Sequence, residues 1–361
     1  MASLQHLSNW LRHTSLGWTL ATTALFASSG SALAATDLKV VGSWSSLALH
    51  QDFEKPFWTK TLPEASDGQF NVQMTTFDQM GIASSDVFRY LSNGLFDVGM
   101  TSADYVVSDA PELEGLDLPM MAPDVDTAHR VANAYMPIAQ RTMNQRFDSH
   151  ALAIVPYPEQ IVFCNTPIKG LADLKGKKVR ASGRSTGEFL QAIGANSVNL
   201  AFNEVPGAME RGVIDCAVTG SLSGYSAGWQ DVSSYLMPLP IGGWDYVLTA
   251  INNKRWNALS KQQQQLLTEQ IQQNFVKPVW ENAHTETQQG IACLTGQGGQ
   301  CEHGKPASMT LVEPSKADEQ HAREALGDHV LPAWAARVDA PTRKAWNNQV
   351  GPIVDLKVPT P

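Results

Sequence analysis

The sequence has no cluster of lysine and arginine interleaved with aromatic residues, and its overall charge is acidic. Its 26 lysines and arginines are outnumbered by 35 aspartates and glutamates, which gives a formal net charge of −9 at pH 7. Proteins that bind nucleic acid neutralise its phosphates with Lys and Arg. Nucleic acid is therefore not an expected partner. A small anionic ligand is still compatible with this charge, because one buried arginine sets the local potential whatever the total.

Beyond residue 34 the sequence also lacks any apolar run of the roughly 20 residues that span a bilayer. Residues 1–34 contain Arg12, no acidic residue, a mostly apolar run over Trp18–Phe26 and the small-residue triplet Ala32–Ala34. These features are typical of a secretory signal. We predict cleavage before Ala35 and export of the remainder.

No residue is marked as a catalytic nucleophile. The segment Gly220–Gly224, GSLSG, is similar to the GxSxG elbow of α/β hydrolases, but Leu222 occupies the central position where the serine is required. None of the nine histidines lies in a motif that places a base beside serine or cysteine. We therefore expect no enzyme. Ser221 and Ser223 stay candidate hydrogen-bond donors to a ligand, with a Gly/Ser turn as the alternative.

Cysteine is scarce, with four residues in the chain. In an exported protein four cysteines most often form two disulfides. Cys293 and Cys301 would close the loop CLTGQGGQC, and Cys164 and Cys216 would then join neighbouring strands. A metal site fits less well, because Cys293, Cys301 and His303 are three soft ligands without a fourth at a finger-like spacing. We expect two disulfides, no metal and no cofactor.

The most informative stretch is 171–220, which alternates strands and helices. A Gly-Lys turn leads into a short strand at 178–180, a helix follows over 185–194, and a second helix ends at Gly212 before a strand at 213–219. This alternation predicts an α/β fold.

Arg180 follows an apolar strand in this stretch. A guanidinium at a buried strand end is costly unless an anion neutralises it. One interpretation is that Arg180 forms a bidentate contact with the carboxylate of a ligand. The alternative is an exposed arginine, or one paired with an acidic residue of the chain itself.

The segments KGKKVR and FNEVPGAMERGVID, with their spacing, resemble the substrate-binding subunits of tripartite ATP-independent periplasmic (TRAP) transporters, the DctP family. The resemblance continues in FDQMG, RYLSNGLFDVGMTSADY and YVLTAINNKRWNALS, and so covers most of the chain. It implies a two-lobed periplasmic binding protein with a hinge and a long helix that spans both lobes. It also implies that Arg180 forms a salt bridge with a substrate carboxylate, and that TRAP membrane subunits receive the ligand.

Two positions differ from the sialic-acid-binding members of that family. Gln160 stands before IVFCNTPI where those members have a second arginine, and Thr219 stands where they have an asparagine. Both stay candidate ligand contacts. With a single arginine, we expect a small or aromatic monocarboxylate rather than sialic acid or a dicarboxylate.

Three further candidates line the ends of predicted strands. Trp44 follows a strand at 38–43, where an α/β sheet places its ligand-facing loops, although packing at a lobe edge explains it equally well. Ser102 ends a strand that would face Thr219 across a cleft. Trp244 lies in a GGWDY segment whose counterpart in the family lies beside the ligand, and its ring favours an apolar or aromatic ligand body.

The chain contains a short internal repeat. Residues 90–102 align with 208–220 at a constant offset, so that Gly94 matches Gly212 and Asp97 matches Asp215. Each copy has a helix that ends at glycine, followed by a strand with an aspartate at its start. The pattern supports two similar lobes, and we interpret the aspartates as strand-entry caps that bond nearby backbone rather than as a catalytic pair.

From these signals we divide the chain into a signal peptide at 1–34, a first lobe of 35–158 plus 249–285, and a second lobe of 159–248 plus 286–361. The resemblance places chain crossings near Pro158, near Leu248 and in the long helix that Ser260 caps. A helix-rich stretch at 126–147 is expected to be interrupted at Pro137.

The favoured hypothesis is a monomeric periplasmic solute receptor that captures an organic acid by closing its lobes. A periplasmic protein that reports its ligand to a membrane sensor is the alternative. An exported hydrolase is the least favoured of the three.

Overall fold

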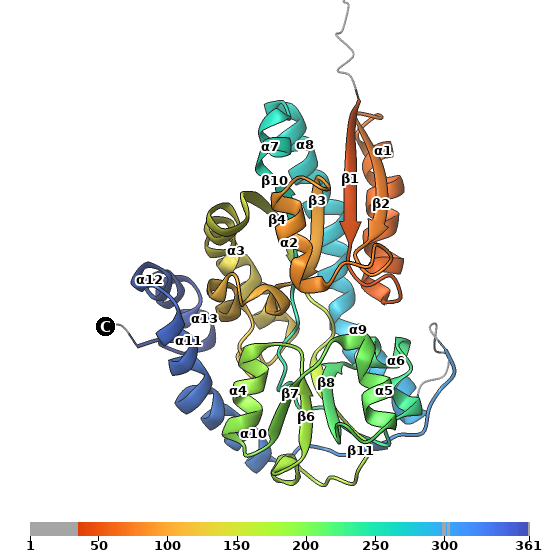
Figure 1. The fold of residues 1–361 in the computed structure, drawn as a ribbon, viewed down its shortest axis with the longest axis vertical. Coiled ribbons are helices and arrows are strands. Elements are labelled where there is room, and N and C mark those ends of the chain that lie inside the picture. The colour runs from red at the N-terminus through yellow and green to blue at the C-terminus, as the bar shows by residue number, and fades with distance from the viewer. Residues whose placement is uncertain (1–34, 298–300, 302–303, 360–361) are drawn as a thin grey trace, which may run out of the picture. The chain divides into compact units, whose positions relative to one another are not determined.

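Two β-sheets organise the chain in the computed structural model, which describes residues 35–297, 301 and 304–359 (Figure 1). The predicted signal peptide at 1–34 lies outside the described residues. In the described part, no helix is both long and apolar enough to cross a membrane.

The first sheet has the strand order β2-β1-β3-β10-β4. Strands β1 and β2 and strands β1 and β3 are parallel, while β10 is antiparallel to both of its neighbours. The strands are β1 Thr36–Gly42, β2 Phe70–Thr76, β3 Val98–Ser102, β4 Ser149–Val155 and β10 Val247–Asn252.

The second sheet has the order β11-β9-β5-β8-β6-β7. Strand β6 is parallel to β7 and β8, and β5 is antiparallel to β8 and β9. The strands are β5 Gln160–Cys164, β6 Lys178–Ala181, β7 Asn196–Asn199, β8 Cys216–Gly220, β9 Tyr235–Met237 and β11 Thr310–Leu311. With helices between its strands, each sheet has the predicted α/β character, and the two-lobed fold is confirmed.

The internal repeat is visible in the way β3 and β8 begin. Asp97 accepts a hydrogen bond from the backbone N–H of Lys39 at 2.8 Å, and Asp215 accepts one from the N–H of Lys178 at 2.8 Å. Both aspartates therefore tie the start of their own strand to a parallel neighbour. This confirms that they are backbone caps, one for each sheet.

Helices cover both sheets (Figure 1). They are α1 Leu62–Ala65, α2 Val87–Ser92, α3 Val125–Phe147, α4 Arg184–Ala192, α5 Val205–Glu210, α6 Ser221–Ser226, α7 Asn253–Ala258, α8 Lys261–Ile271, α9 Lys277–Thr295, α10 Lys316–Ala325, α11 Leu331–Arg337, α12 Ala340–Gln349 and α13 Gly351–Val354.

Helices α8 and α9 form one long helix through a wider turn at Gln272–Val276. Ser260 accepts a bond from the N–H of Gln263 at 3.2 Å, which confirms the predicted cap. The wider turn directly precedes Pro278, which has no N–H to donate. The helix contacts β4 of the first sheet and α6 beside the second, as predicted for a helix that spans both lobes.

Helix α3 runs unbroken through Pro137, so the expected interruption was wrong. Asp124 caps its N-terminus by accepting the N–H of Thr127 at 2.7 Å. Val131, Ile138 and other apolar residues of one face are buried. Packing of this long face outweighs the one backbone hydrogen bond that a proline removes.

The chain passes between the sheets at 156–159 and 238–246. The C-terminal tryptophans, which we assigned to the second lobe, donate to carbonyls of a segment assigned to the first. Trp334 bonds Pro111 at 3.0 Å and Trp346 bonds Gly115 at 2.8 Å. The residue boundaries of the lobes stay a prediction.

Both predicted disulfides are present in the structure. Cys164 and Cys216 face each other across the antiparallel strands β5 and β8, and Cys293 is joined to Cys301 after α9. The first bridge fixes the pairing at the centre of the second sheet.

Candidate ligand-binding site

Arg180 lies in β6 with only 1% of its surface exposed. Its hydrogen bonds go to uncharged oxygens: Nε to the carbonyl of Leu200 at 2.9 Å, Nη1 to the carbonyl of Val218 at 2.7 Å, and Nη2 to the hydroxyl of Tyr105 at 2.8 Å. None of the ion pairs in the described part of the chain includes Arg180. The structure therefore does not support the alternative in which Arg180 pairs with an acidic residue of the chain itself.

These contacts hold the guanidinium in place without neutralising it. They use three of its five N–H donors, and two are left over in the described contacts. A buried cation without a paired anion is unfavourable. The geometry is that of a positive group prepared to receive an oxygen anion.

Arg180 faces a small cavity. Its lining comes from segments that adjoin both sheets, namely Trp44, Leu47, Tyr105, Tyr157, Arg180, Phe202, Thr219, Ser223 and Asp245. The free volume is about 10 Å³, which is about the room that one water molecule needs. An organic acid can therefore enter only if the walls move apart.

A larger groove adjoins this cavity. It has a volume of about 750 Å³, and Trp44 and Phe202 line both spaces. One side of the groove is formed by residues 77–84, which follow β2, and the other by residues 201–206, which follow β7. The groove is thus a route by which a solute can reach Arg180 when the two sides separate.

Four of the nine residues that line the cavity are aromatic. The ring of Trp44 lies 4.8 to 6.1 Å, centre to centre, from the rings of Phe77, Tyr105, Tyr157 and Phe202. Most of these pairs meet edge to face or tilted, as aromatic packing favours. The wall suits a flat or apolar ligand body.

On the side of the second sheet, Phe202 stacks on Trp229 with ring centres 5.3 Å apart. The guanidinium carbon of Arg180 lies 6.0 Å from the centre of the same Trp229 ring. At this distance the ring face attracts the cation weakly. Trp229 therefore packs against both the Arg180 guanidinium and Phe202 of the cavity wall.

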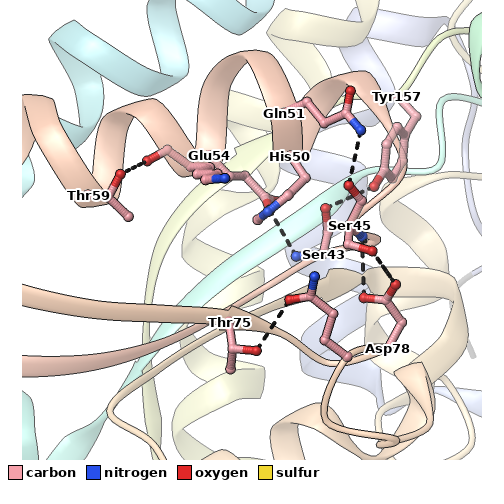
Figure 2. Close-up of polar contacts among 11 residues, drawn as sticks. Ser43, Ser45, His50, Gln51, Glu54, Thr59, Thr75, Asp78 and Tyr157 are labelled. Carbon is pink, nitrogen blue, oxygen red and sulfur yellow. Dashed lines mark hydrogen bonds and ion pairs between the residues drawn. The ribbon is translucent and has the colours of Figure 1, made fainter. Parts of the chain in front are cut away.

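The segment that carries Trp44 is held by a buried polar network (Figure 2). The N–H of Ser43 donates to Glu54 at 2.9 Å, and the same carboxylate oxygen lies 2.9 Å from His50 Nδ1. The hydroxyl of Tyr157 donates to the hydroxyl of Ser43 at 3.0 Å. Ser43, the residue before Trp44, is therefore hydrogen-bonded both to Glu54 in the following helical segment and to Tyr157 in the cavity wall.

Asp245 is the one acidic residue in the lining of this cavity. Ser102, at the end of β3, donates a hydrogen bond to it. Asp117 accepts the N–H groups of Trp244 at 2.9 Å and of Asp245 at 2.6 Å. Burial, together with the charge of nearby Asp104, raises the pKa of Asp245 well above its ordinary value.

The structure brings some of the predicted site residues to the cavity and leaves others outside. Arg180, Trp44, Thr219 and Ser223 line it, and Ser102 reaches it through Asp245. Their contact with a ligand stays a prediction.

Three predicted residues have partners elsewhere. Gln160 donates to the carbonyl of Pro158 at 2.8 Å, Trp244 donates to the carbonyl of Ala122 at 2.9 Å, and Ser221 donates to the carbonyl of Thr287 at 2.9 Å. None of these side chains lines the cavity. In the described structure they brace the chain crossings and the long helix.

Sequence reasoning did not single out five of the lining residues, which are Leu47, Tyr105, Tyr157, Phe202 and Asp245. Asp245 follows directly on Trp244 in the GGWDY segment, and Tyr105 ends a stretch that was expected to border the cleft. The signal was therefore a position at a strand end, without any motif that marks the individual side chain. Within the described residues, no group of three or more His, Cys, Asp or Glu could hold a metal ion.

A family model described as bacterial extracellular solute-binding protein, family 7 (DctP) matches residues 45–330. The chain belongs to the DctP family. The resemblance seen in the sequence is thereby confirmed. The description of this family is that of extracellular solute-binding proteins.

Two solved structures illustrate the shared DctP fold. DctP7 of Bordetella pertussis, a receptor that binds pyroglutamic acid, is 18% identical with a TM-score of 0.76, and the match covers 89% of this chain and 100% of that one. A TRAP solute-binding protein of Desulfovibrio salexigens with bound orotic acid is 18% identical with a TM-score of 0.77, covering 88% and 99%. At this identity the likeness establishes the fold alone.

Among curated proteins, the ectoine-binding periplasmic protein TeaA of Halomonas elongata is 26% identical over 201 residues, or 54% of this chain and 58% of TeaA. The uncharacterized protein YiiZ of Salmonella typhimurium is 25% identical over 189 residues, or 50% of this chain and 55% of YiiZ. The chain thus spans somewhat over half the length of the curated DctP relatives it matches.

Proposed function

We propose that the protein is a periplasmic receptor that captures a small organic acid by binding its carboxylate to Arg180. The single observation that carries this proposal is the buried guanidinium with two free N–H donors and no acidic partner, aimed into an aromatic cavity. Charge-assisted bonds to a carboxylate are about twice as strong as neutral ones. We further propose that the receptor is a monomer.

Capture requires the walls to separate and close. Tyr105 and Asp245 adjoin strands of the first sheet, whereas Arg180 and Thr219 belong to the second. A ligand bound between them touches both sides, and it therefore stabilises the closed arrangement. The crossings at 156–159 and 238–246 and the long helix are where we expect the hinge.

The ligands of similar proteins guide the choice of test compounds. Pyroglutamate and orotate are bound in solved structures, and TeaA is named for ectoine. Each of these compounds carries a carboxylate on a ring that fits an aromatic wall. A further similar protein of Desulfovibrio desulfuricans holds sn-glycerol 3-phosphate, which is also an anion. We favour ring monocarboxylates for this chain.

A thermal-shift screen tests receptor function. Compounds that bind only the folded state raise its melting temperature, by an amount equivalent to about 2.7 kcal/mol at a concentration of 100 times Kd. We expect at least one ring monocarboxylate to raise the melting temperature, with calorimetry confirming one site per chain. A screen in which no organic acid shifts the melting temperature contradicts the proposal.

Delivery to membrane subunits is the second half of the proposal. With the identified acid, proteoliposomes that contain the cognate TRAP membrane subunits should accumulate the acid only when this protein is added. If the ligand-loaded protein supports no uptake but is retained by the extracellular domain of a sensor, the reporting function replaces the transport function.

A further inference from the structure

Arg180 is the only basic residue and Asp245 the only acidic residue in the lining of the cavity. We propose that the site selects acids that also carry a nitrogen-bound hydrogen, with Arg180 binding the carboxylate and Asp245 accepting the N–H. The ligand class is a ring or small acid with a lactam, amidine or ammonium nitrogen. This inference rests on the proposed receptor function and adds the second half of the recognition.

Arg180 and Asp245 each have another hydrogen-bond partner and do not pair with each other. Arg180 donates to the hydroxyl of Tyr105 at 2.8 Å, while Asp245 accepts from Ser102. No ion pair between Arg180 and Asp245 is among those of the described residues. A site built only for an apolar acid does not need a carboxyl in its wall, because burying a polar group against an apolar ligand is unfavourable.

The backbone of Asp245 is fixed in an uncommon conformation. Its φ angle is +46°, in the left-handed region that aspartate tolerates better than most residues. Asp117 accepts the N–H of Asp245 at 2.6 Å and that of Trp244 at 2.9 Å. These bonds hold the loop before β10 so that the carboxyl of Asp245 stands at the cavity.

The positions of Arg180 and Asp245 link recognition of the ligand to closure of the two sides of the site. Asp245 precedes β10 in the first sheet, and Arg180 lies in β6 of the second. A ligand with both groups accepts hydrogen bonds on the Arg180 side and donates one on the Asp245 side, whereas a plain acid forms directed bonds with Arg180 only. Burial and Asp104 raise the pKa of Asp245, yet an oxygen of the carboxyl accepts an N–H in either protonation state.

Matched pairs of acids test the inference. Pyroglutamate is compared with the lactone that has oxygen in place of its N–H, and proline with tetrahydrofuran-2-carboxylate. We expect the nitrogen-containing member of at least one pair to bind at least ~10-fold more tightly to the wild type, the size of one buried hydrogen bond. In Asp245→Gly, which removes the acceptor and tolerates the positive φ at this position, the preference should fall to about 1, while affinity for the oxygen-containing member changes little.

Asp109→Asn is the control, because Asp109 forms a surface ion pair with Arg89 outside the cavity. It should keep the wild-type preference. Equal affinity within both pairs, or an unchanged preference in Asp245→Gly, overturns the inference and leaves receptor function intact. So does a protein that binds other acids but none of these four. Failure to bind any organic acid overturns both the inference and the receptor function.

Discussion

Replacing Arg180 with alanine should weaken binding of the protein's organic acid by at least ~10-fold, or about 1.4 kcal/mol. The wild-type side chain is buried and has two N–H donors left for a ligand oxygen, so alanine removes both the charge and the directed bonds. Arg180→Lys should lie between the two, since it keeps the charge but loses the planar fork. Isothermal titration calorimetry measures all three affinities.

Arg180→Ala also leaves the carbonyls of Leu200 and Val218 without their side-chain donor. Some loss of stability is therefore expected, and circular dichroism must show that each variant is folded at the titration temperature. Arg89→Ala is the matched control, because Arg89 is an exposed arginine in a surface ion pair. Unchanged affinity in a folded Arg180→Ala variant would remove Arg180 from the site.

The stability of the protein should fall as pH rises from about 4.5 to 7, and Glu286 in the long helix should account for part of this fall. Glu286 is 5% exposed, and burial followed by the charge of Asp52 raises its pKa from 4.5 to about 7. The folded state therefore holds a proton that the unfolded chain releases more easily. This contribution is complete below about pH 4.5 and is lost as pH rises through about 7.

Glu286→Gln should remove that dependence. Relative to the variant, the wild type should lose about 2 to 3 kcal/mol between pH 4.5 and 7.5, as a shift of this size implies. Urea denaturation across this range measures the difference. Glu281→Gln is the control, because Glu281 lies in the same helix with its side chain 66% exposed. A constant difference between the wild type and Glu286→Gln at every pH contradicts the assignment.

Much of the fold could be predicted because its signals are local. The helix cap at Ser260 and the strand-entry bonds of Asp97 and Asp215 each depend on residues close to one element end. The disulfide pairing followed from cysteine spacing and strand order. The helix through Pro137 could not be predicted, because tertiary packing of one apolar face outweighed the local effect of the proline.

Only part of the candidate site could be predicted from the sequence, because tertiary packing also decides which side chains reach the cavity. Arg180 stood out because a cation after an apolar strand is unusual by itself. Tyr105, Phe202 and Asp245 reach the cavity from three distant segments, and nothing in their local sequence distinguishes them from packing residues. Trp244 shows the converse, since it directly precedes Asp245 of the lining but its own side chain donates to the carbonyl of Ala122.

The position of the bound carboxylate tests the account most directly. A crystal structure of the complex with the acid found by the screen should place two carboxylate oxygens at about 2.7 to 2.9 Å from Arg180 nitrogens, between Trp44 and Phe202. An acid bound elsewhere, with Arg180 still holding only Leu200, Val218 and Tyr105, would contradict it.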